Sequence, residues 1–374
     1  MPRWIAVALL VAGLASLSFS DARRACSADD WLATLDLEWK IAQLLIVRFD
    51  GPVLAPDLAA MIRRHRVGGV AVYAKAGNIV DGAQVQRLVT TMQDVSAVPL
   101  AVVVDQEGGR VDRLESVRGK RPSAETLAAS TDPARAAAAG REDAADLARL
   151  GIAVNLAPVV DVTRVYNWQL SERTFGGDAA TVARFAGAYL DGLQASGRVV
   201  GVLKHFPGLG SVAEDPHQML PRTAVTRDEL EAIDWAPYRT LLAAGGVHAI
   251  MVSHVIVDAL DPARPGSLAP AVVTGGLRDA LGFDGVVVVD SLGMKGASVG
   301  AESTIGDRAV AAWLAGNDWL LGAKTARDVA DIVTRAVRAV ASGELGVDRI
   351  DRSLRRVLAL KERVGLLPRA GCGD

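Results

Sequence analysis

The chain has 374 residues, half of them hydrophobic, and 41 Lys and Arg against 43 Asp and Glu give a formal net charge of −2. This length is enough for one large hydrophobic core or two smaller ones. The charge balance is near neutral and no basic run or basic and aromatic stripe is present, so we expect no nucleic-acid partner.

The N-terminus has the pattern of an export signal. Arg3 supplies a positive charge, an apolar run covers residues 5–19, and small residues follow at its end, as in a secretory signal peptide. The run is short for a membrane span. We therefore expect a signal peptide over 1–20, an N-terminal segment over 21–38 and an exported protein, periplasmic or extracellular. An uncleaved N-terminal membrane anchor and lipidation at Cys26 stay open.

The two cysteines, Cys26 and Cys372, lie near opposite ends of the chain. Their separation does not match the spacing of metal ligands in known cysteine motifs. A disulfide that joins the two ends and a pair of free thiols both remain open.

Eight short apolar runs recur along the chain, rich in Val, Ile and Leu and without alternation. Such runs are typical of strands buried on both faces of a parallel sheet. Amphipathic segments, for example at 81–95 and 181–197, lie between them. The pattern predicts an α/β fold, a single (β/α)8 barrel of the TIM type, over 39–370. A doubly wound open sheet is the alternative, but no dinucleotide-binding glycine motif supports it. The runs are QLLIVRFDG, VGGVAVYAK, LAVVVDQEGG, NLAPVVDV, VVGVLKHFPG, HAIMVSHVIV, DGVVVVDSLG and DWLLGAK.

Polar residues close five of these runs. Each one alone is as consistent with a helix cap or a turn as with a function. The carboxyl ends of barrel strands meet at one face, however, where catalytic groups lie. We therefore expect one polar pocket, formed by Asp105, Asp161, Lys204 with His205, His254 and Asp290.

The loop over 204–221 holds two of the five histidines. Pro216 favours extended backbone around it, and in an extended stretch residues two apart point to the same side. Asp215 is therefore placed to orient His217 and to favour its protonated form, which suits a general acid/base. A solvent-exposed turn with incidental charges is the alternative.

Each of the other candidate polar groups has two possible interpretations. Asp290 ends the most hydrophobic run and suits a nucleophile or a general base, or it caps the following helix. Asp105, Glu107, Arg110 and Arg113 surround a Gly-Gly turn. They are suited to hold a polyhydroxylated substrate by charge-assisted hydrogen bonds, or they form an ion-pair network that holds the loop.

A metal site is the weaker interpretation of the histidines. His205, His217 and His254 have carboxylates nearby, but no H-x-x-x-H motif or cysteine cluster accompanies them, so we expect no metal and no cofactor. His65 and His248 lie in a helix-like segment and at a strand entry, where a structural or surface role is the simplest interpretation.

In their order, the motifs of this chain resemble glycoside hydrolase family 3, specifically its single-domain β-N-acetylglucosaminidase branch. The resemblance runs from about Lys40 to Leu367. The motifs are DQEGGRVDRL, NLAPVVDV, SERTFGGD, KHFPG, a D-x-H triplet, MVSHV, LGFDGVVVVDSLGMKG, AGNDWLL and RIDRSLRRVLALK. The chain departs from the usual family loop at Leu209 and Pro216, which affects the expected leaving-group preference more than the chemistry.

The resemblance implies a retaining double displacement. Asp290 matches the nucleophile, and His217 matches the acid/base with Asp215 as its partner. The acid/base has to come from the barrel, because the C-terminal domain of two-domain relatives has no counterpart here. The positions that match sugar-binding residues are Asp105, Arg113, Arg173, Lys204 and His205, and His254 and Met294 lie in motifs that line the same pocket.

The sequence therefore predicts an exported exo-β-N-acetylglucosaminidase that acts on peptidoglycan fragments or other GlcNAc-terminated glycans, with a carbohydrate substrate and no implied stable protein partner. The alternatives are another family 3 β-glycosidase, a non-catalytic sugar-binding protein, and a Schiff-base aldolase that uses Lys204. Water and phosphate both remain open as the acceptor.

Overall fold

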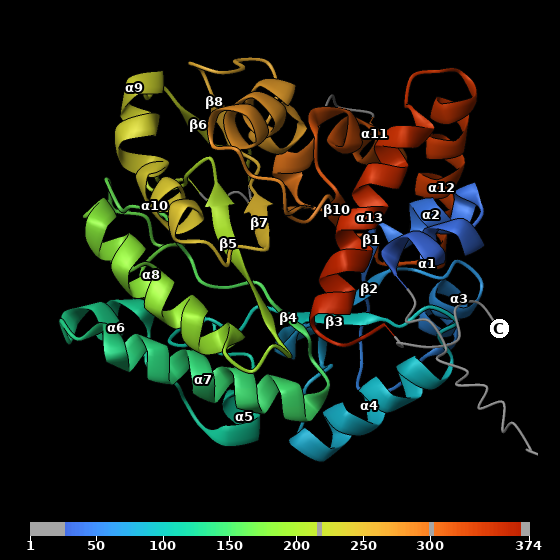
Figure 1. Cartoon of the computed structure of the whole chain (residues 1–374), viewed down its shortest axis with the longest axis horizontal. Coiled ribbons are helices and arrows are strands. Elements are labelled where there is room, and N and C mark those ends of the chain that lie inside the picture. Colours follow the sequence, from blue (N-terminus) through green and yellow to red (C-terminus); the bar gives the residue numbers. More distant parts are fainter. Residues whose placement is uncertain (1–26, 215–218, 299–302, 368–374) are drawn as a thin grey trace, which may run out of the picture.

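The structure is a computed structural model that describes residues 27–214, 219–298 and 303–367 (Figure 1). The expected signal peptide, both cysteines and the Asp215–His217 pair lie outside these residues. In the part of the chain that is described, no helix is both long and apolar enough to cross a membrane.

Eight parallel strands close into a barrel (Figure 1), which confirms the predicted (β/α)8 fold. Seven of the eight apolar runs contain one of these strands, and the fourth, NLAPVVDV, begins at the last residue of its strand. In order around the barrel they are β1 (Leu45–Arg48), β10 (Trp319–Leu321), β9 (Val286–Val289), β7 (Ala249–Val252), β5 (Val200–Phe206), β4 (Val154–Asn155), β3 (Ala101–Val104) and β2 (Gly69–Val72).

Strand β9 shows why the apolar runs become central strands. Its four residues are all valine and all buried, because one face of the strand points into the barrel and the other packs under helices. β-Branched side chains suit such a pleated surface packed on both sides. The strand is hydrogen-bonded to β7 on one side and β10 on the other.

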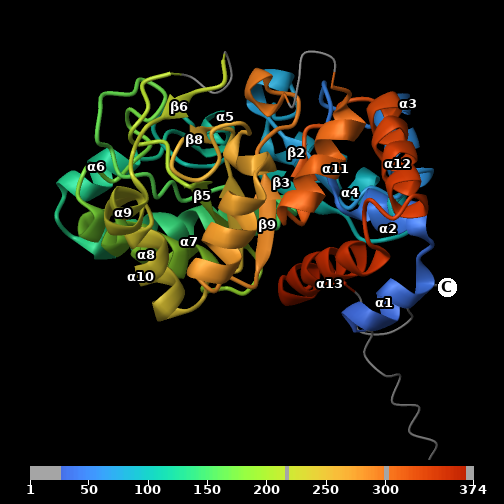
Figure 2. The same cartoon turned by 90° about the horizontal axis from the view of Figure 1, so that it is seen from above.

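Helices surround the barrel (Figures 1 and 2). They are α1 (Ala28–Thr34), α2 (Leu37–Gln43), α3 (Pro56–Arg63), α4 (Gly82–Asp94), α5 (Glu115–Arg118), α6 (Ala124–Ala129), α7 (Pro133–Leu150), α8 (Ala179–Gln194), α9 (Arg227–Glu229), α10 (Ala236–Ala244), α11 (Ile305–Ala315), α12 (Ala326–Ala341) and α13 (Val347–Arg363). Shorter or wider helical turns are η1 (Ala74–Ala76), η2 (Leu230–Asp234), η3 (Gly266–Leu268), η4 (Ala271–Ala280) and η5 (Lys295–Ala297).

Helices α7 and α8 pack with their backbones in close contact. A Cβ atom at Gly140 would lie 2.2 Å from the carbonyl oxygen of Tyr189, and one at Gly192 would lie 2.1 Å from that of Ala137. Any larger residue at either glycine would force the helices apart. This packing holds the two helices that flank β4, the strand whose following loop contributes to the pocket described below.

A second, two-stranded parallel sheet lies outside the barrel. It pairs β6 (Arg222–Thr223) with β8 (Ile256–Val257), so it ties the loop after β5 to the loop after β7. The Thr223 hydroxyl also hydrogen-bonds the hydroxyl of Ser211 at 3.0 Å. The two sides of the long loop after β5 are therefore fastened to each other and to the neighbouring loop.

The segment expected to precede the barrel domain contains α1, which packs against α13 (Figure 2). Trp31, Leu32 and Leu35 are buried in the same hydrophobic core as the barrel helices. Asp29 adds an ion pair to Arg355 at 2.8 Å. Helix α1 therefore shares one hydrophobic core with the barrel domain.

Lys361 in α13 is a fully buried lysine away from the barrel mouth. Its ammonium donates to Gln43 Oε1 and to the Pro99 carbonyl oxygen, each at 2.9 Å, and no ion pair to it is found among the described residues. Burial lowers the pKa of Lys361 from 10.5 to about 7, because a charged amine is poorly solvated in the core.

This lowered pKa predicts a stability that rises with pH. Between about pH 7 and pH 10 the unfolded chain keeps the proton on Lys361 while the folded chain has released it, so raising the pH favours folding. Relative to Lys361→Met, the wild type should gain stability over this range, by at most about 1.4 kcal/mol per pH unit. Unfolding curves at several pH values measure the gain. Lys120→Met, at an exposed position, is the control, and parallel curves for wild type and Lys361→Met would contradict the prediction.

Candidate active site

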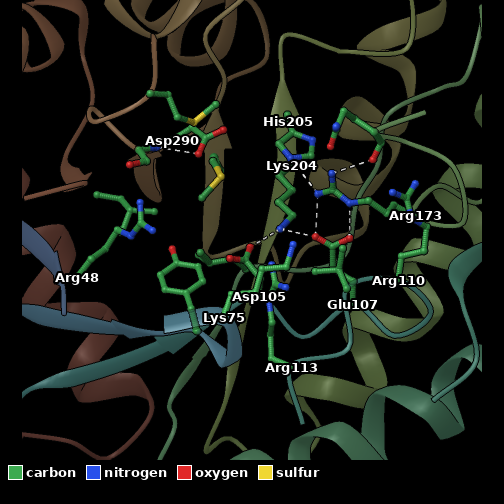
Figure 3. Close-up of a pocket in the computed structure, with 18 of the residues that line it drawn as sticks. Arg48, Lys75, Asp105, Glu107, Arg110, Arg113, Arg173, Lys204, His205 and Asp290 are labelled. Atoms are coloured by element: carbon green, nitrogen blue, oxygen red, sulfur yellow. Dashed lines mark hydrogen bonds and ion pairs between the residues drawn. The ribbon is translucent and has the colours of Figure 1, made fainter. Parts of the chain in front are cut away.

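A pocket of about 550 Å³ opens at the carboxyl ends of the barrel strands. Strands spread around the whole ring, or the loops that follow them, contribute its walls (Figure 3). Seven of the ten residues predicted from the sequence line it: Asp105, Arg113, Arg173, Lys204, His205, Asp290 and Met294. Asp215 and His217 lie outside the described residues, and His254 lies behind the pocket wall.

Lys204, on β5, forms the centre of the pocket floor. Its side chain is only 1% exposed, and its ammonium lies 2.6 Å from Asp105 Oδ1 and 2.7 Å from Glu107 Oε1. Figure 3 shows the lysine reaching down between the two carboxylates, which follow β3. A buried ammonium needs such partners, because a charge removed from water is poorly solvated unless an opposite charge lies beside it.

Glu107 links this lysine to Arg173. The Arg173 guanidinium donates to both Glu107 oxygens, at 2.7 Å through Nε and 2.9 Å through a terminal nitrogen. Burial by itself would raise the pKa of Glu107, but Arg173 and Lys204 outweigh burial and hold that pKa well below its usual range. Burial likewise disfavours the charge on Arg173, and Glu107 raises its pKa. Both groups are therefore ionised whenever the protein is folded near neutral pH.

His205 is oriented by its neighbours on both sides. Its Nδ1 lies 2.7 Å from Asp161 Oδ2 and its Nε2 lies 3.4 Å from Arg173. Because a carboxylate only accepts and a guanidinium only donates, Nδ1–H donates to Asp161 and Nε2 accepts from Arg173. Asp161 also accepts the backbone N–H of Leu209 at 2.8 Å, so one carboxylate fixes both the imidazole and the start of the next loop.

Asp290, directly after β9, belongs to the opposite wall. In the ring of eight strands β9 and β3 lie four places apart, so Asp290 and Asp105 approach the pocket from opposite sides. Asp290 Oδ1 accepts the backbone N–H of Ser291 at 2.7 Å, which orients the carboxylate at the strand end.

His254 supports this strand end from behind. It is fully buried, its Nε2 lies 3.1 Å from the Ser291 carbonyl oxygen, and its Nδ1 lies 2.6 Å from the Ser267 hydroxyl. Burial lowers its pKa, so the neutral ring donates from Nε2 and accepts at Nδ1. We therefore assign His254 a positioning role for the backbone next to Asp290.

The remaining wall combines cations with apolar surface. Arg48, at the end of β1, lies with its guanidinium 4.9 Å from the centre of the Tyr73 ring. The Nε atoms of Arg48 and Arg113 are buried and have no hydrogen-bond partner among the described residues, and both side chains line the pocket. Met251 on β7, Met294 in the loop after β9 and Leu321 on β10 supply apolar surface.

The arrangement suits a neutral, polyhydroxylated ring. The ion-paired groups at the floor are fixed hydrogen-bond donors and acceptors. Such groups are suited to hold hydroxyl groups by charge-assisted hydrogen bonds. Asp290 faces the same space from the other wall, and a carboxylate in this position is suited to act as a nucleophile. Lys204 is held by two carboxylates, whereas a Schiff-base lysine has to present a neutral amine, so this geometry does not favour an aldolase. The described residues contain no cluster of His, Cys, Asp and Glu that could hold a metal ion.

For two residues of this site, Glu107 and Asp161, the sequence predicts a place at the pocket but not the partner. Glu107 forms an ion-pair network, one of the two roles expected for the charges near the Gly-Gly turn, and Asp161, expected as a strand end at the pocket, contacts His205. Both act through side chains distant in sequence, so no local motif marks their roles. Asp161 also lies six residues beyond the end of β4 and reaches the site by way of His205.

The family profile described as "Glycosyl hydrolase family 3 N terminal domain" matches residues 36–360. The protein named beta-hexosaminidase LpqI of Mycobacterium tuberculosis is 37% identical over 342 residues, which cover 89% of this chain and 84% of the relative. Its solved structure superposes with a TM-score of 0.82 at 34% identity, over 91% of this chain and 97% of LpqI.

Two further relatives are similar over most of this chain. The solved structure of a family 3 β-N-acetylglucosaminidase from a Paenibacillus species has a TM-score of 0.84 and 36% identity, over 90% of this chain and 64% of that one. A protein of the fungus Arthroderma benhamiae, named an uncharacterized secreted glycosyl hydrolase, is 31% identical over 341 residues, 88% of this chain and 94% of the relative.

The central position of Glu107 predicts a large effect on stability. Glu107→Gln would leave the buried Arg173 without its carboxylate and Lys204 with only one, a loss of about 3 kcal/mol or more in unfolding free energy at pH 7. Because the folded pKa of Glu107 is lowered, this contribution is complete above the unfolded pKa of about 4.3 and declines as the pH falls below it. Denaturant unfolding at pH 7 and pH 3.5 measures both effects.

The exposed Glu115 is the matched control, and Glu115→Gln should leave the unfolding midpoint nearly unchanged. A Glu107→Gln protein as stable as the wild type at pH 7 would show that the ion pairs around Glu107 do not hold the pocket floor.

Proposed function

The chain belongs to glycosyl hydrolase family 3, and we propose that it is an exported, retaining exo-β-N-acetylglucosaminidase that removes terminal β-linked GlcNAc from peptidoglycan fragments or similar glycans. It is a glycoside hydrolase of the β-N-acetylhexosaminidase type, as its relatives named beta-hexosaminidase and β-N-acetylglucosaminidase are. The stereochemistry, the acid/base, the natural substrate and the export are the finer parts of the proposal.

One observation carries the proposal. A carboxylate, Asp290, approaches a pocket whose opposite wall and floor are an ion-paired cluster of Asp105, Glu107, Lys204 and Arg173. The floor offers fixed partners for hydroxyl groups, and the carboxylate on the other side is oriented by the Ser291 N–H. This division between a binding wall and a reacting wall is what a glycosidase with a covalent intermediate requires.

In the first step, an Asp290 oxygen bonds to the anomeric carbon while the bond from that carbon to the leaving oxygen breaks. The electron pair of the broken bond goes to the leaving oxygen, which takes a proton from His217. In the second step, water attacks the anomeric carbon, the bond to Asp290 breaks, and His217 takes the proton of the water. Two inversions give a β-configured product. Asp215 would stabilise the protonated imidazole between the steps.

The sugar-binding roles are assigned residue by residue. Lys204 and Asp105 would hold hydroxyl groups at the floor, and His205 and Arg173 would contact the ring beside them. Arg113, which also lines the pocket, would bind a further oxygen of the sugar. Lys204, Asp105, His205 and Arg173 are already fixed by contacts with one another and with Glu107 and Asp161, so little entropy is lost when the sugar binds.

Export and substrate are proposed together. The apolar, export-like residues 1–20 support a secreted enzyme, as does the relative whose name calls it secreted. An exported enzyme would meet cell-wall glycans, and peptidoglycan fragments contain terminal GlcNAc. We also propose 39–370 as the extent of the barrel domain.

Asp290→Ala should lower kcat/KM for an aryl β-N-acetylglucosaminide by roughly 10⁴-fold or more, since it removes the group that bonds to the sugar. Added azide should restore turnover and give the α-glycosyl azide, because the small anion then attacks from the vacated side. Steady-state rates of variant and wild type measure the loss in kcat/KM, and NMR of the products identifies the anomeric configuration of the azide. The exposed Asp279, changed to Ala, is the control, and an Asp290→Ala enzyme with wild-type rates would rule out the nucleophile.

His217→Ala should affect poor leaving groups more than good ones, because only a poor leaving group needs protonation in the first step. We expect kcat/KM for the phenyl glycoside to fall about 10²- to 10³-fold, and that for the 2,4-dinitrophenyl glycoside to fall about tenfold at most. Steady-state rates for a series of substituted phenyl glycosides measure the difference. Equal losses across the series would count against the acid/base role.

A further inference from the structure

An exposed tryptophan lies at the mouth of the pocket. Trp168 belongs to the loop between β4 and α8, lines the pocket, and is 58% exposed. An exposed indole at the rim of a pocket offers a flat aromatic face on which a ligand can pack. None of the mechanistic steps above uses this residue.

The ring is held in place by contacts on its own loop and on the loop after β3. The Arg110 guanidinium lies 3.7 Å from the centre of the Trp168 ring and also donates to the Trp168 carbonyl oxygen. On the C-terminal side, the Gln169 carbonyl oxygen accepts from Arg173 at 3.0 Å and the Gln169 N–H donates to Asn167 Oδ1 at 2.8 Å. The indole is thus presented by a backbone fastened to the pocket floor.

Trp168 is far more exposed to solvent than the residues of the pocket floor. Lys204 and Glu107 have side chains that are 1% and 4% exposed, whereas Trp168 is more than half exposed. If the terminal sugar occupies the floor, as the proposed function requires, the ring at the mouth meets what is attached to that sugar.

A second contact places Trp168 on the leaving-group side. The buried Asn167 next to it donates from Nδ2 to the Val212 carbonyl oxygen at 2.7 Å. Val212 belongs to the loop after β5, three residues before Asp215. The loop that presents the indole is therefore hydrogen-bonded to the loop from which, in the proposed function, the leaving oxygen receives its proton.

We propose that Trp168, backed by Arg110, is the platform of a subsite for the leaving-group sugar, a pyranose whose apolar C–H face stacks on the indole. This inference rests on the proposed function. Sugar rings and indoles both have flat, weakly polar faces, and such stacking combines apolar burial with the electrostatics of the aromatic face. The subsite makes the enzyme selective for glycans over GlcNAc linked to small groups.

The same loop supplies a control. Tyr166 is 77% exposed, two residues from Trp168, but it does not line the pocket. Removal of its ring tests whether any loss of aromatic surface on this loop has the effect expected for Trp168.

The test compares N,N′-diacetylchitobiose, whose leaving group is a sugar, with GlcNAc β-fluoride, whose leaving group has no ring. For Trp168→Ala, the ratio of kcat/KM for the disaccharide to kcat/KM for the fluoride should fall about tenfold relative to wild type. Trp168→Phe should give an intermediate ratio and Tyr166→Ala a ratio within about twofold of wild type.

An unchanged ratio in Trp168→Ala overturns the subsite, whether both substrates slow equally or neither does. So does a fall of the same size in Tyr166→Ala, which would assign the effect to the loop as a whole. If the wild type hydrolyses neither substrate, the proposed function has failed, and that result is distinct from failure of the subsite.

Discussion

The carboxylate of Glu107 between Lys204 and Arg173 is the interaction on which the site depends. Both cations are buried, and neither would keep its charge in the barrel mouth without a fixed anion beside it. Through Arg173 the same carboxylate reaches His205, and through Lys204 it reaches Asp105. A single buried charge thus holds the floor of the pocket as one rigid unit.

The barrel supplies the frame in which such a unit can form. Asp105 and Glu107 follow β3, Arg173 comes from the loop after β4, and Lys204 and His205 lie on β5, three neighbouring strands of the ring. Asp290 comes from β9, opposite β3. The groups proposed to bind the sugar therefore gather at the floor, and the carboxylate proposed to react lies on the far wall, so the two proposed roles fall to different side chains.

The outer part of the pocket is built on a different principle. Trp168 is held by Arg110 and by backbone contacts rather than by buried ion pairs. Trp168 and the floor residue Arg173 thus lie on one loop but are fixed by different kinds of contact. Leu209 connects the two parts of the pocket. Its side chain departs from the usual family loop, but its backbone N–H donates to the buried Asp161.

The sequence by itself determined the strands and seven of the residues that line the pocket. Runs such as VVVV are typical of central strands, because they are apolar on both faces, and the carboxyl ends of the parallel strands of a barrel meet at one face. Tertiary structure alone decided which side chains pair. Glu107, Asp161 and His254 act through partners far along the chain, and His254 proved to support Asp290 from behind rather than to line the pocket. The platform at Trp168 has the same origin, since its contacts come from loops that only the closed barrel brings together.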